Sequence, residues 1–355
     1  MAADFARVEM ERLIDLQQDE EVVILDDRLN ALPLQIRDTP LTGPMVWTRH
    51  TLSPTDGVVV LSPQCVGELD QVLAVLRRNP LPMLLLQPAM FELDACRSMM
   101  EAARHELQQG PGFVIIDRLP VDRYSLDEAR SIDWLLMQLL GRPVAQSFDG
   151  KMVYDVKDQG RTFTTSVRGD TTTKNQNFHT DNNYNLCEPH YVSLFCLKTA
   201  KSGGINSIVS FYSAYNEMLA RHPIELLERM YQPYLFNRQR EHAPGDPLVL
   251  RHPLFSYDGE TLLCKLSRIQ IVNGYRMAGQ PLDEIGLEAL LALDAIMMEE
   301  QFNREFFFEP GQIQIVDNRR CGHRRTGFVD HDEPERKRHL LRIWLRNTGR
   351  PFYNG

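Results

Sequence analysis

The chain has 355 residues, of which 43% are hydrophobic, and a formal net charge of −9 at pH 7. This length accommodates one large domain or two smaller ones with a sizeable buried core. Lys and Arg are interspersed with Asp and Glu, so the sequence lacks the basic field of a nucleic-acid-binding protein, and we expect no nucleic-acid partner.

The cysteines and the N-terminus bear on the cellular location. The six cysteines are widely separated and form no C-x-x-C pair, which argues against a disulfide scaffold or a zinc ribbon. The N-terminus lacks the basic region and apolar stretch of a signal peptide, and no apolar run reaches about 18 residues. We therefore expect a reducing, cytoplasmic location and no membrane association.

Residues 1–108 contain no recognisable chemical motif and predict a mixed, partly helical N-terminal extension. Apolar residues recur with helical spacing in residues 66–78, and residues 91–107 are a second helix candidate. We expect this extension to cover the core or to form the interface of a homo-oligomer. The main domain is expected at residues 109–355.

The main domain is predicted to begin with a buried strand at residues 113–116, where four apolar residues are consecutive. Ser125 and Glu128 have the spacing of a capping box, which opens a helix that runs to about Leu140. Residues 152–156 predict another strand.

Residues 157–177 form a long polar segment that contains Gly160 and Gly169. A loop of this length within a compact domain is usually functional. We expect a mobile lid that closes over the site when its ligands are bound. The alternative is an ordered loop packed by Phe163 and Val167.

An imidazole and a carboxylate follow this segment in Phe178-His179-Thr180-Asp181, and Cys321-Gly322-His323 supplies a second imidazole about 140 residues later. Side chains two residues apart share one face of an extended segment, so His179 and Asp181 can bind one ion if this stretch is extended. Two His and one carboxylate on one side of an ion leave the opposite positions free, as is typical of non-haem Fe(II) sites. We expect Cys321 to be a small buried thiol rather than a ligand.

The rest of the chain alternates short strands with helices, which suggests a double-sheet jelly roll. A long amphipathic helix, capped by Asp283 and continuing to residue 302, is expected to buttress a sheet. Two Arg pairs, at 319–320 and 324–325, flank His323 and predict either a solvated loop or a patch that attracts anions to the site. The other expected elements are strands at 191–197, 205–210, 305–308, 312–316 and 340–345 and helices at 213–221 and 223–230.

The order of these motifs resembles the TauD/TfdA family of Fe(II)/2-oxoglutarate-dependent dioxygenases, which is related to the clavaminate synthase-like enzymes. The resemblance runs from about residue 110 to residue 346. It implies a distorted double-stranded β-helix in which His179, Asp181 and His323 bind Fe(II). It also implies that Arg338 pairs with the far carboxylate of 2-oxoglutarate, and that Arg342 contacts the cosubstrate or an anionic group of the substrate.

One motif departs from the family pattern. Gly203-Gly204-Ile205-Asn206-Ser207 carries Asn206 where the family offers a hydroxyl to 2-oxoglutarate. The Asn206 amide can also donate a hydrogen bond, and Ser207 would replace it if the loop shifted by one residue. Asn175, four residues before His179, matches a substrate-contacting position in some family members.

The resemblance implies a reaction with Fe(II) as cofactor and with 2-oxoglutarate and O2 as cosubstrates, releasing succinate and CO2. We expect hydroxylation of an unactivated C–H bond in a small polar substrate such as an amino acid derivative. Retention of Asp181 argues against halogenation, whereas desaturation or cyclisation would use the same ligands. Two alternatives are a mononuclear zinc hydrolase, because two His and a carboxylate also suit Zn²⁺, and a non-catalytic jelly-roll binding protein. The zinc hydrolase leaves Arg338 without a task, and the sequence has no H-E-x-x-H motif.

Overall fold

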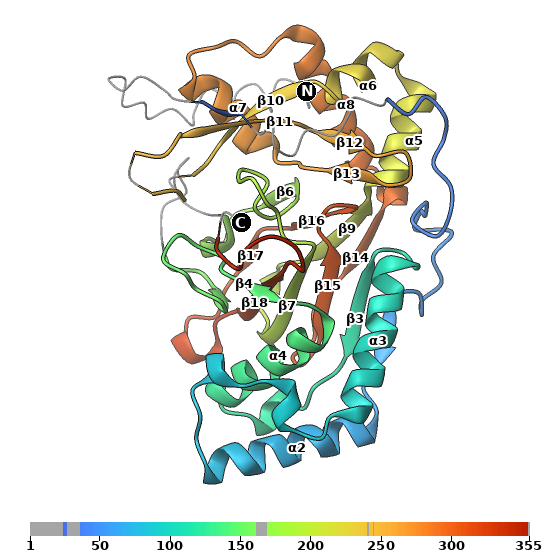
Figure 1. Cartoon of the computed structure of the whole chain (residues 1–355). Coiled ribbons are helices and arrows are strands. Elements are labelled where there is room, and N and C mark those ends of the chain that lie inside the picture. Colours follow the sequence, from blue (N-terminus) through green and yellow to red (C-terminus); the bar gives the residue numbers. More distant parts are fainter. Residues whose placement is uncertain (1–23, 27–35, 161–168, 240, 244, 354–355) are drawn as a thin grey trace.

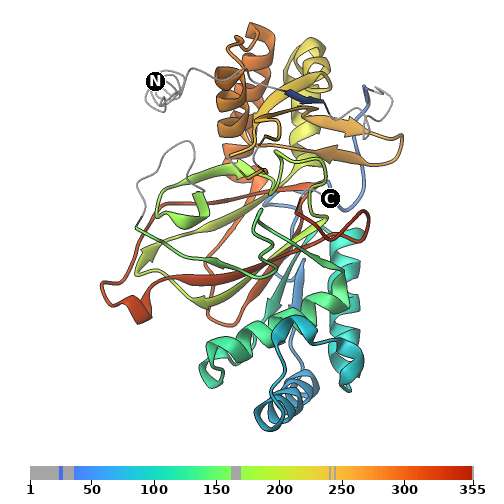
Figure 2. The same ribbon diagram turned by 60° about the vertical axis from the view of Figure 1, so that its left-hand side comes forward.

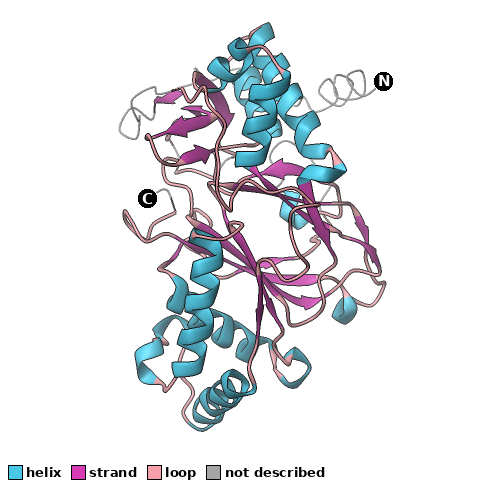
Figure 3. Cartoon of the chain, turned by 90° about the vertical axis from the view of Figure 1, so that its right-hand side faces the viewer, coloured by secondary structure: helices cyan, strands magenta, loops and turns pink. Residues whose placement is uncertain are grey.

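The computed structural model describes residues 24–26, 36–160, 169–239, 241–243 and 245–353. Strands occupy the middle of the molecule and helices gather at its two ends (Figure 3). In the described part of the chain, no helix is long and apolar enough to cross a membrane.

The larger sheet has seven strands. Their order is β2-β3-β15-β7-β18-β4, and β5 also pairs with β18. The central strand β7 is antiparallel to both neighbours, β15 and β18. The strands are β2 (Val58–Val60), β3 (Phe113–Asp117), β4 (Pro143–Val144), β5 (Tyr154–Val156), β7 (Tyr191–Lys198), β15 (Ile313–Asp317) and β18 (His339–Leu345).

A second sheet of four strands has the order β14-β9-β16-β6, and the short pair β17-β8 lies apart from it. The chain passes from the larger sheet to this one between β7 and β9 and again between β15 and β16. These two sheets form the double-stranded β-helix expected from the sequence (Figures 1 and 2). The strands are β6 (Gln176–His179), β8 (Ser202–Gly203), β9 (Asn206–Ser210), β14 (Asn303–Phe306), β16 (Cys321–Arg325) and β17 (Phe328–Val329).

Three helices cover one face of the larger sheet (Figure 1): α2 (Pro63–Arg78), α3 (Asp94–Gln108) and α4 (Leu126–Leu140). Their apolar residues share one buried cluster with β3, β7, β15 and β18. The capping box of α4 is formed as expected. Because β2 also pairs with β3, the N-terminal segment packs on strands that follow it. The predicted boundary at residue 108 between an N-terminal extension and the main domain stays a prediction.

The other end of the molecule is built from four helices, a three-stranded sheet and a hairpin (Figure 1). The three-stranded sheet has the order β1-β11-β10, and β12 pairs with β13. The elements are β1 (Ile24–Asp26), β10 (Pro233–Asn237), β11 (Val249–Pro253), β12 (Phe255–Tyr257), β13 (Leu262–Cys264), α5 (Phe211–Arg221), α6 (Ile224–Met230), α7 (Arg268–Met277) and α8 (Glu284–Met298).

The expected helix from Asp283 to residue 302 is too long. Asp283 caps α8 by accepting a hydrogen bond from the Gly286 amide, but the helix ends at Met298 because Glu299 is extended. A 3-10 turn then leads into β14. The described residues include the 3-10 turns η2 (Met83–Leu85), η3 (Pro88–Met90), η4 (Val121–Arg123), η5 (Gly169–Thr171), η6 (Glu300–Phe302) and η7 (Pro334–Arg336).

The polar segment at 157–177 is described only in part. Its middle, residues 161–168, lies outside the described residues, and so do Phe163 and Val167. Its last part forms η5 and the start of β6. The expected lid therefore stays a prediction.

Candidate metal centre

Two imidazoles meet across a pair of antiparallel strands. His179 is the last residue of β6, His323 is the middle residue of β16, and the two are direct partners in the ladder. Because opposite residues of a ladder project to the same face, their rings lie 4.5 Å apart between centroids. Strand pairing thus brings together two residues that are far apart in the sequence.

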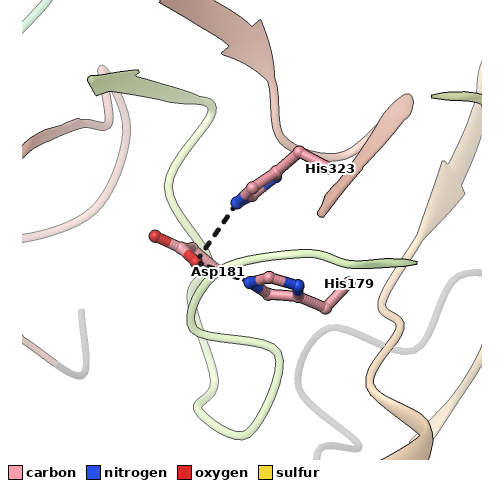
Figure 4. A group of neighbouring side chains, drawn as sticks. All are labelled: His179, Asp181 and His323. Atoms are coloured by element: carbon pink, nitrogen blue, oxygen red, sulfur yellow. Dashed lines mark ion pairs between the residues drawn. The ribbon is translucent and has the colours of Figure 1, made fainter. Parts of the chain in front are cut away.

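Asp181 reaches the same point from a turn. Strand β6 ends at His179, so Asp181 lies two residues beyond the strand, where the predicted extended stretch passes into a turn. The chain turns at Asn182, whose φ of 55° is in the left-handed region that Asn tolerates better than most residues. The turn directs the Asp181 carboxylate back to the imidazoles (Figure 4).

The three side chains fit one metal ion. The Nε2 atoms of His179 and His323 each lie 3.6 Å from Oδ1 of Asp181, and the ligand atoms all fall within 4.8 Å of one another. Ligand atoms that are each about 2.1 Å from one ion stand about 3 Å apart, so small inward movements suffice. The donor set of two nitrogens and one carboxylate oxygen is that of a facial triad.

Neighbouring groups hold the other oxygen of Asp181. The indole Nε1 of Trp344 donates a 2.7 Å hydrogen bond to Oδ2, and Nη1 of Arg342 lies 3.1 Å from the same atom. The Asn318 side chain accepts from the Asp181 amide and donates to the Asp181 carbonyl. This shell fixes both the side chain and the backbone of the carboxylate, as outer partners of metal ligands commonly do.

The protonation states of the ligands suit metal binding. Burial alone would raise the pKa of Asp181, but Arg342 and the two imidazoles hold that pKa well below its usual range. Burial, together with nearby His179, lowers the pKa of His323. Nδ1 of His179 lies 2.8 Å from the Asn177 carbonyl, which favours the tautomer with a free Nε2. A carboxylate and neutral imidazoles are the forms that bind a metal.

The three candidate ligand residues line a cavity of about 560 Å³. Its walls come from β6, β7, β9, β16, β18 and α7, together with the segment at 169–175. Alternate residues of one strand face it, namely Arg338 just before β18 and then Leu340, Arg342 and Trp344. This is the two-residue period of a strand.

Arg338 is buried and lines this cavity. It is 4% exposed, and its Nη1 has no hydrogen-bond partner among the described residues. Burial lowers its pKa to about 10. The guanidinium packs 5.2 Å from the centre of the Phe328 ring. A buried cation is costly unless its N–H groups are hydrogen-bonded, so the unbonded Nη1 is available to an anionic ligand.

Arg342, by contrast, is already paired. Its Nη1 lies 3.0 Å from Oδ2 of Asp170 as well as 3.1 Å from Asp181. Its Nε donates to Oε1 of Gln146. Nη2 has no hydrogen-bond partner in the part of the chain that is described. Arg342 therefore stabilises the carboxylate of Asp181, which the sequence did not predict, and its Nη2 group stays available at the cavity.

Asn206 and Ser207 face opposite sides of β9, as neighbouring strand residues do. Asn206 lines the cavity, and its Nδ2 donates to the carbonyl of Gly204. The Ser207 hydroxyl accepts from Arg324 and is outside the cavity lining. Asn175 also lines the cavity and is exposed at its rim.

The four Arg residues around His323 do not form a solvated loop, because residues 321–325 are strand β16. Arg320 pairs with Asp317, and Arg324 pairs with Glu305. Arg325 is 4% exposed and donates from Nη2 to the carbonyls of Thr172 and Lys174. Cys321 is a buried free thiol, as expected.

Sequence reasoning missed several residues of this site. Asn318 and Trp344 hold Asp181 through contacts that only the fold creates. Helix α7, which brings Gln270 and Asn273 to the cavity, was not predicted. A signal for α7 was present in the helical spacing of the apolar residues Ile271 and Tyr275, but buried polar residues interrupt the apolar stripe.

A double-stranded β-helix that presents two imidazoles and a carboxylate in a cavity defines the class of non-haem iron oxygenases. Residues 87–344 match the model of the family described as "Taurine catabolism dioxygenase TauD, TfdA family". Because this match spans more than half of its length, the chain belongs to the TauD/TfdA family. It is an Fe(II)- and 2-oxoglutarate-dependent dioxygenase, with O2 as second cosubstrate.

Two curated relatives cover most of the chain. FR-33289 synthase of Streptomyces rubellomurinus is 26% identical over 326 residues, which cover 90% of this chain and 94% of the relative. The taurine hydroxylase-like protein SAT17 of Stachybotrys chartarum is 25% identical over 320 residues, which cover 85% of this chain and 79% of the relative.

Solved structures share the fold. Asparagine oxygenase in complex with Fe(II), 3-hydroxyasparagine and succinate has a TM-score of 0.62 at 19% identity, with 82% of this chain and 94% of that chain covered. The non-haem iron oxygenase OrfP in complex with Fe and α-ketoglutaric acid has a TM-score of 0.56 at 18% identity, with the same coverage.

Proposed function

We propose that His179, Asp181 and His323 bind the Fe(II) of a hydroxylase that acts on an amino acid derivative or a similar small polar metabolite. The observation that carries this proposal is the convergence of both Nε2 atoms on one oxygen of Asp181. Bound iron supplies the activation of O2 needed to oxidise an unactivated C–H bond, with 2-oxoglutarate converted to succinate and CO2. The residues of the chain orient the reactants and exclude water.

Arg338 is proposed to bind the far carboxylate of 2-oxoglutarate. A guanidinium can hold a carboxylate through two parallel hydrogen bonds, and the free Nη1 of this buried side chain supports such a pair. Gly204 lies against it, since a Cβ built there would be 3.6 Å from Nε of Arg338. Asn206, whose amide is bonded to the Gly204 carbonyl, is therefore proposed to donate to the same carboxylate, in preference to Ser207.

The substrate is proposed to lie on the side of Asn175 and Arg342. Both residues line the cavity, and Nη2 of Arg342 is available to an acceptor group of the substrate. The proposal of an amino acid derivative is supported by the solved relatives, whose complexes contain 3-hydroxyasparagine and (3S)-hydroxy-L-Arg. Hydroxylation is proposed over halogenation because the carboxylate ligand is present.

The decisive experiment is anaerobic addition of 2-oxoglutarate to the Fe(II)-loaded protein, followed by visible spectroscopy. We expect a weak charge-transfer band, because chelation of Fe(II) by a 2-oxo acid produces one. A zinc hydrolase or a binding protein without iron chemistry predicts no band. Release of succinate under air is the second readout, and absence of both the band and succinate would refute the proposal.

We also infer a homo-oligomer formed through the N-terminal segment and a cytoplasmic location. The first inference is supported by exposed apolar residues between α2 and α3, namely Leu81, Leu84, Leu85 and Met90. The second is supported by the six free thiols, which suit a reducing compartment. Light scattering of the wild-type protein and Leu84→Glu tests the interface, and a wild-type monomer would contradict it.

A further inference from the structure

We propose that Asn183, Gln270 and Asn273 form a carboxamide wall that binds a neutral amide group of the substrate. This inference rests on the proposed function, because it assigns one side of the cavity in which the substrate would react. It adds a class of chemical group, an amide, that neither the metal ligands nor the arginines select.

The three side chains are buried, polar and incompletely bonded. Asn183, Gln270 and Asn273 are each 3–4% exposed and all line the cavity. Oδ1 of Asn183, Oε1 of Gln270 and Nδ2 of Asn273 have no hydrogen-bond partner among the residues described. Buried polar atoms in native proteins are nearly always bonded. Three such atoms in one cavity therefore point to a ligand that bonds them.

The wall is held at a fixed place relative to the metal ligands. Ser267, immediately before α7, forms an antiparallel bridge with His179. Thr180 donates from its amide to the Leu266 carbonyl and accepts from the Leu266 amide through its hydroxyl. On α7, Gln270 and Asn273 are three residues apart and so lie side by side on one face.

The free atoms include both acceptors and a donor. The Asn183 amide nitrogen donates to the Thr180 carbonyl, which leaves Oδ1 as an acceptor. Gln270 offers a second acceptor, and Asn273 offers a donor. An amide supplies an N–H group for the acceptors and a carbonyl for the donor, whereas a carboxylate has no proton to donate. The wall therefore favours an amide over an acid.

Most arginines that line the cavity lie on other elements than α7. Arg338 and Arg342 belong to the β18 side and Arg325 belongs to β16. On α7 itself, Arg268 pairs with Asp294 at 2.8 Å, so its charge is compensated. In the cavity lining, the amides of α7 are therefore joined on that helix by one compensated charge, whereas Arg338 and Arg342 on the β18 side offer cations to carboxylates.

The test uses matched compounds that differ only in the amide. They are L-asparagine with L-aspartate, L-glutamine with L-glutamate, and N-acetyl-β-alanine with 5-oxohexanoate, in which a methylene replaces the N–H group. Each is added anaerobically to the complex of enzyme, Fe(II) and 2-oxoglutarate, and binding is measured from the change in the charge-transfer band. We expect at least one amide to bind tenfold or more tightly than its partner. Equal binding within every pair, or no binding of any amide at millimolar concentration, would overturn the inference.

Two variants and a matched control link the preference to the wall. Gln270→Leu and Asn273→Leu should each reduce the amide preference tenfold or more. Gln280→Leu, at an exposed amide just beyond the same helix, should leave it unchanged. If the preference survives in both wall variants, the wall does not recognise the amide.

Thermal unfolding of the ligand-free proteins distinguishes recognition from a structural role. A leucine in place of an unpaired buried amide should leave the melting temperature equal or higher. A marked fall in both variants would show that the amides serve the fold and would overturn the inference. The band formed by 2-oxoglutarate alone reports on the proposed function, so a normal band without amide preference rejects the wall alone.

Discussion

Replacing Arg338 by methionine should have opposite effects on stability and on cosubstrate binding. The side chain is almost fully buried, and burial lowers its pKa from 12.5 to about 10. Because the pKa of Arg338 is lower in the folded protein than in the unfolded chain, the charged guanidinium destabilises the folded state at every pH below about 10. That difference corresponds to a cost of about 3 kcal/mol at neutral pH.

The methionine removes this cost and also removes the stacking of the guanidinium on Phe328, worth about 0.5–1 kcal/mol. We therefore expect the ligand-free Arg338→Met protein to be about 2 kcal/mol more stable than wild type. Binding of 2-oxoglutarate should weaken by about 2–5 kcal/mol, the usual cost of breaking a buried charge pair. The two quantities are measured by chemical denaturation and by titration of the charge-transfer band.

Arg342→Met is the matched control. Arg342 is equally buried, but Asp170 and Asp181 compensate its charge. Its removal leaves carboxylates without their cation, so we expect destabilisation of about 3–5 kcal/mol and a smaller loss of 2-oxoglutarate affinity than for Arg338→Met. The reasoning would be refuted if Arg338→Met were the less stable variant, or if it bound 2-oxoglutarate as tightly as wild type.

Three other predictions concern single side chains. His179→Ala should abolish tight iron binding, measured by metal analysis, without unfolding the protein. The control variant His50→Ala, at an exposed histidine, should bind iron normally. Unchanged 2-oxoglutarate turnover in His179→Ala would contradict the ligand assignment. Trp344→Phe removes the hydrogen bond to Asp181 and should lower iron affinity about 10- to 100-fold, so an unchanged affinity would mean that this bond does not orient the ligand. Asp133 is fully buried without a described partner, and burial raises its pKa. Because the folded state then retains a proton that the unfolded chain releases, the stability of the protein should fall as pH rises above about 4. Asp133→Leu should remove this fall and raise stability at pH 7 by about 1–3 kcal/mol, and chemical denaturation at several pH values measures both effects.

The local motifs of the site could be predicted from the sequence. His179 and Asp181 are close in the chain, and His323 and Arg338 are 15 residues apart on or beside the successive long strands β16 and β18, with the short β17 and the turn η7 between them. The four positions from Arg338 to Trp344 face one cavity because of the two-residue strand period. These features depend on short-range geometry, which a sequence carries directly.

The contacts between distant segments could not be predicted in the same way. The pairing of Arg342 with Asp170 depends on where the loop before β6 returns to β18. The end of α8 was misplaced because Phe302 lies at helical spacing from Met298, whereas the backbone at Glu299 leaves the helix. Helix α7 was missed because its buried polar residues serve the cavity rather than the core. At α7, polar residues that line the cavity interrupt the apolar pattern by which a helix is recognised in a sequence.

The two carboxylate oxygens of Asp181 have different partners, and this difference determines how many of them could bind a metal ion. Oδ2 already accepts from Trp344 and Arg342, which leaves only Oδ1 directed at the imidazoles. An ion with roughly six octahedral positions would then receive three protein ligands and keep three vacancies. A chelating carboxylate would occupy one more and leave no room for a bidentate 2-oxo acid together with a further small molecule. By holding Oδ2 of Asp181, Trp344 and Arg342 would keep that carboxylate from chelating a bound ion.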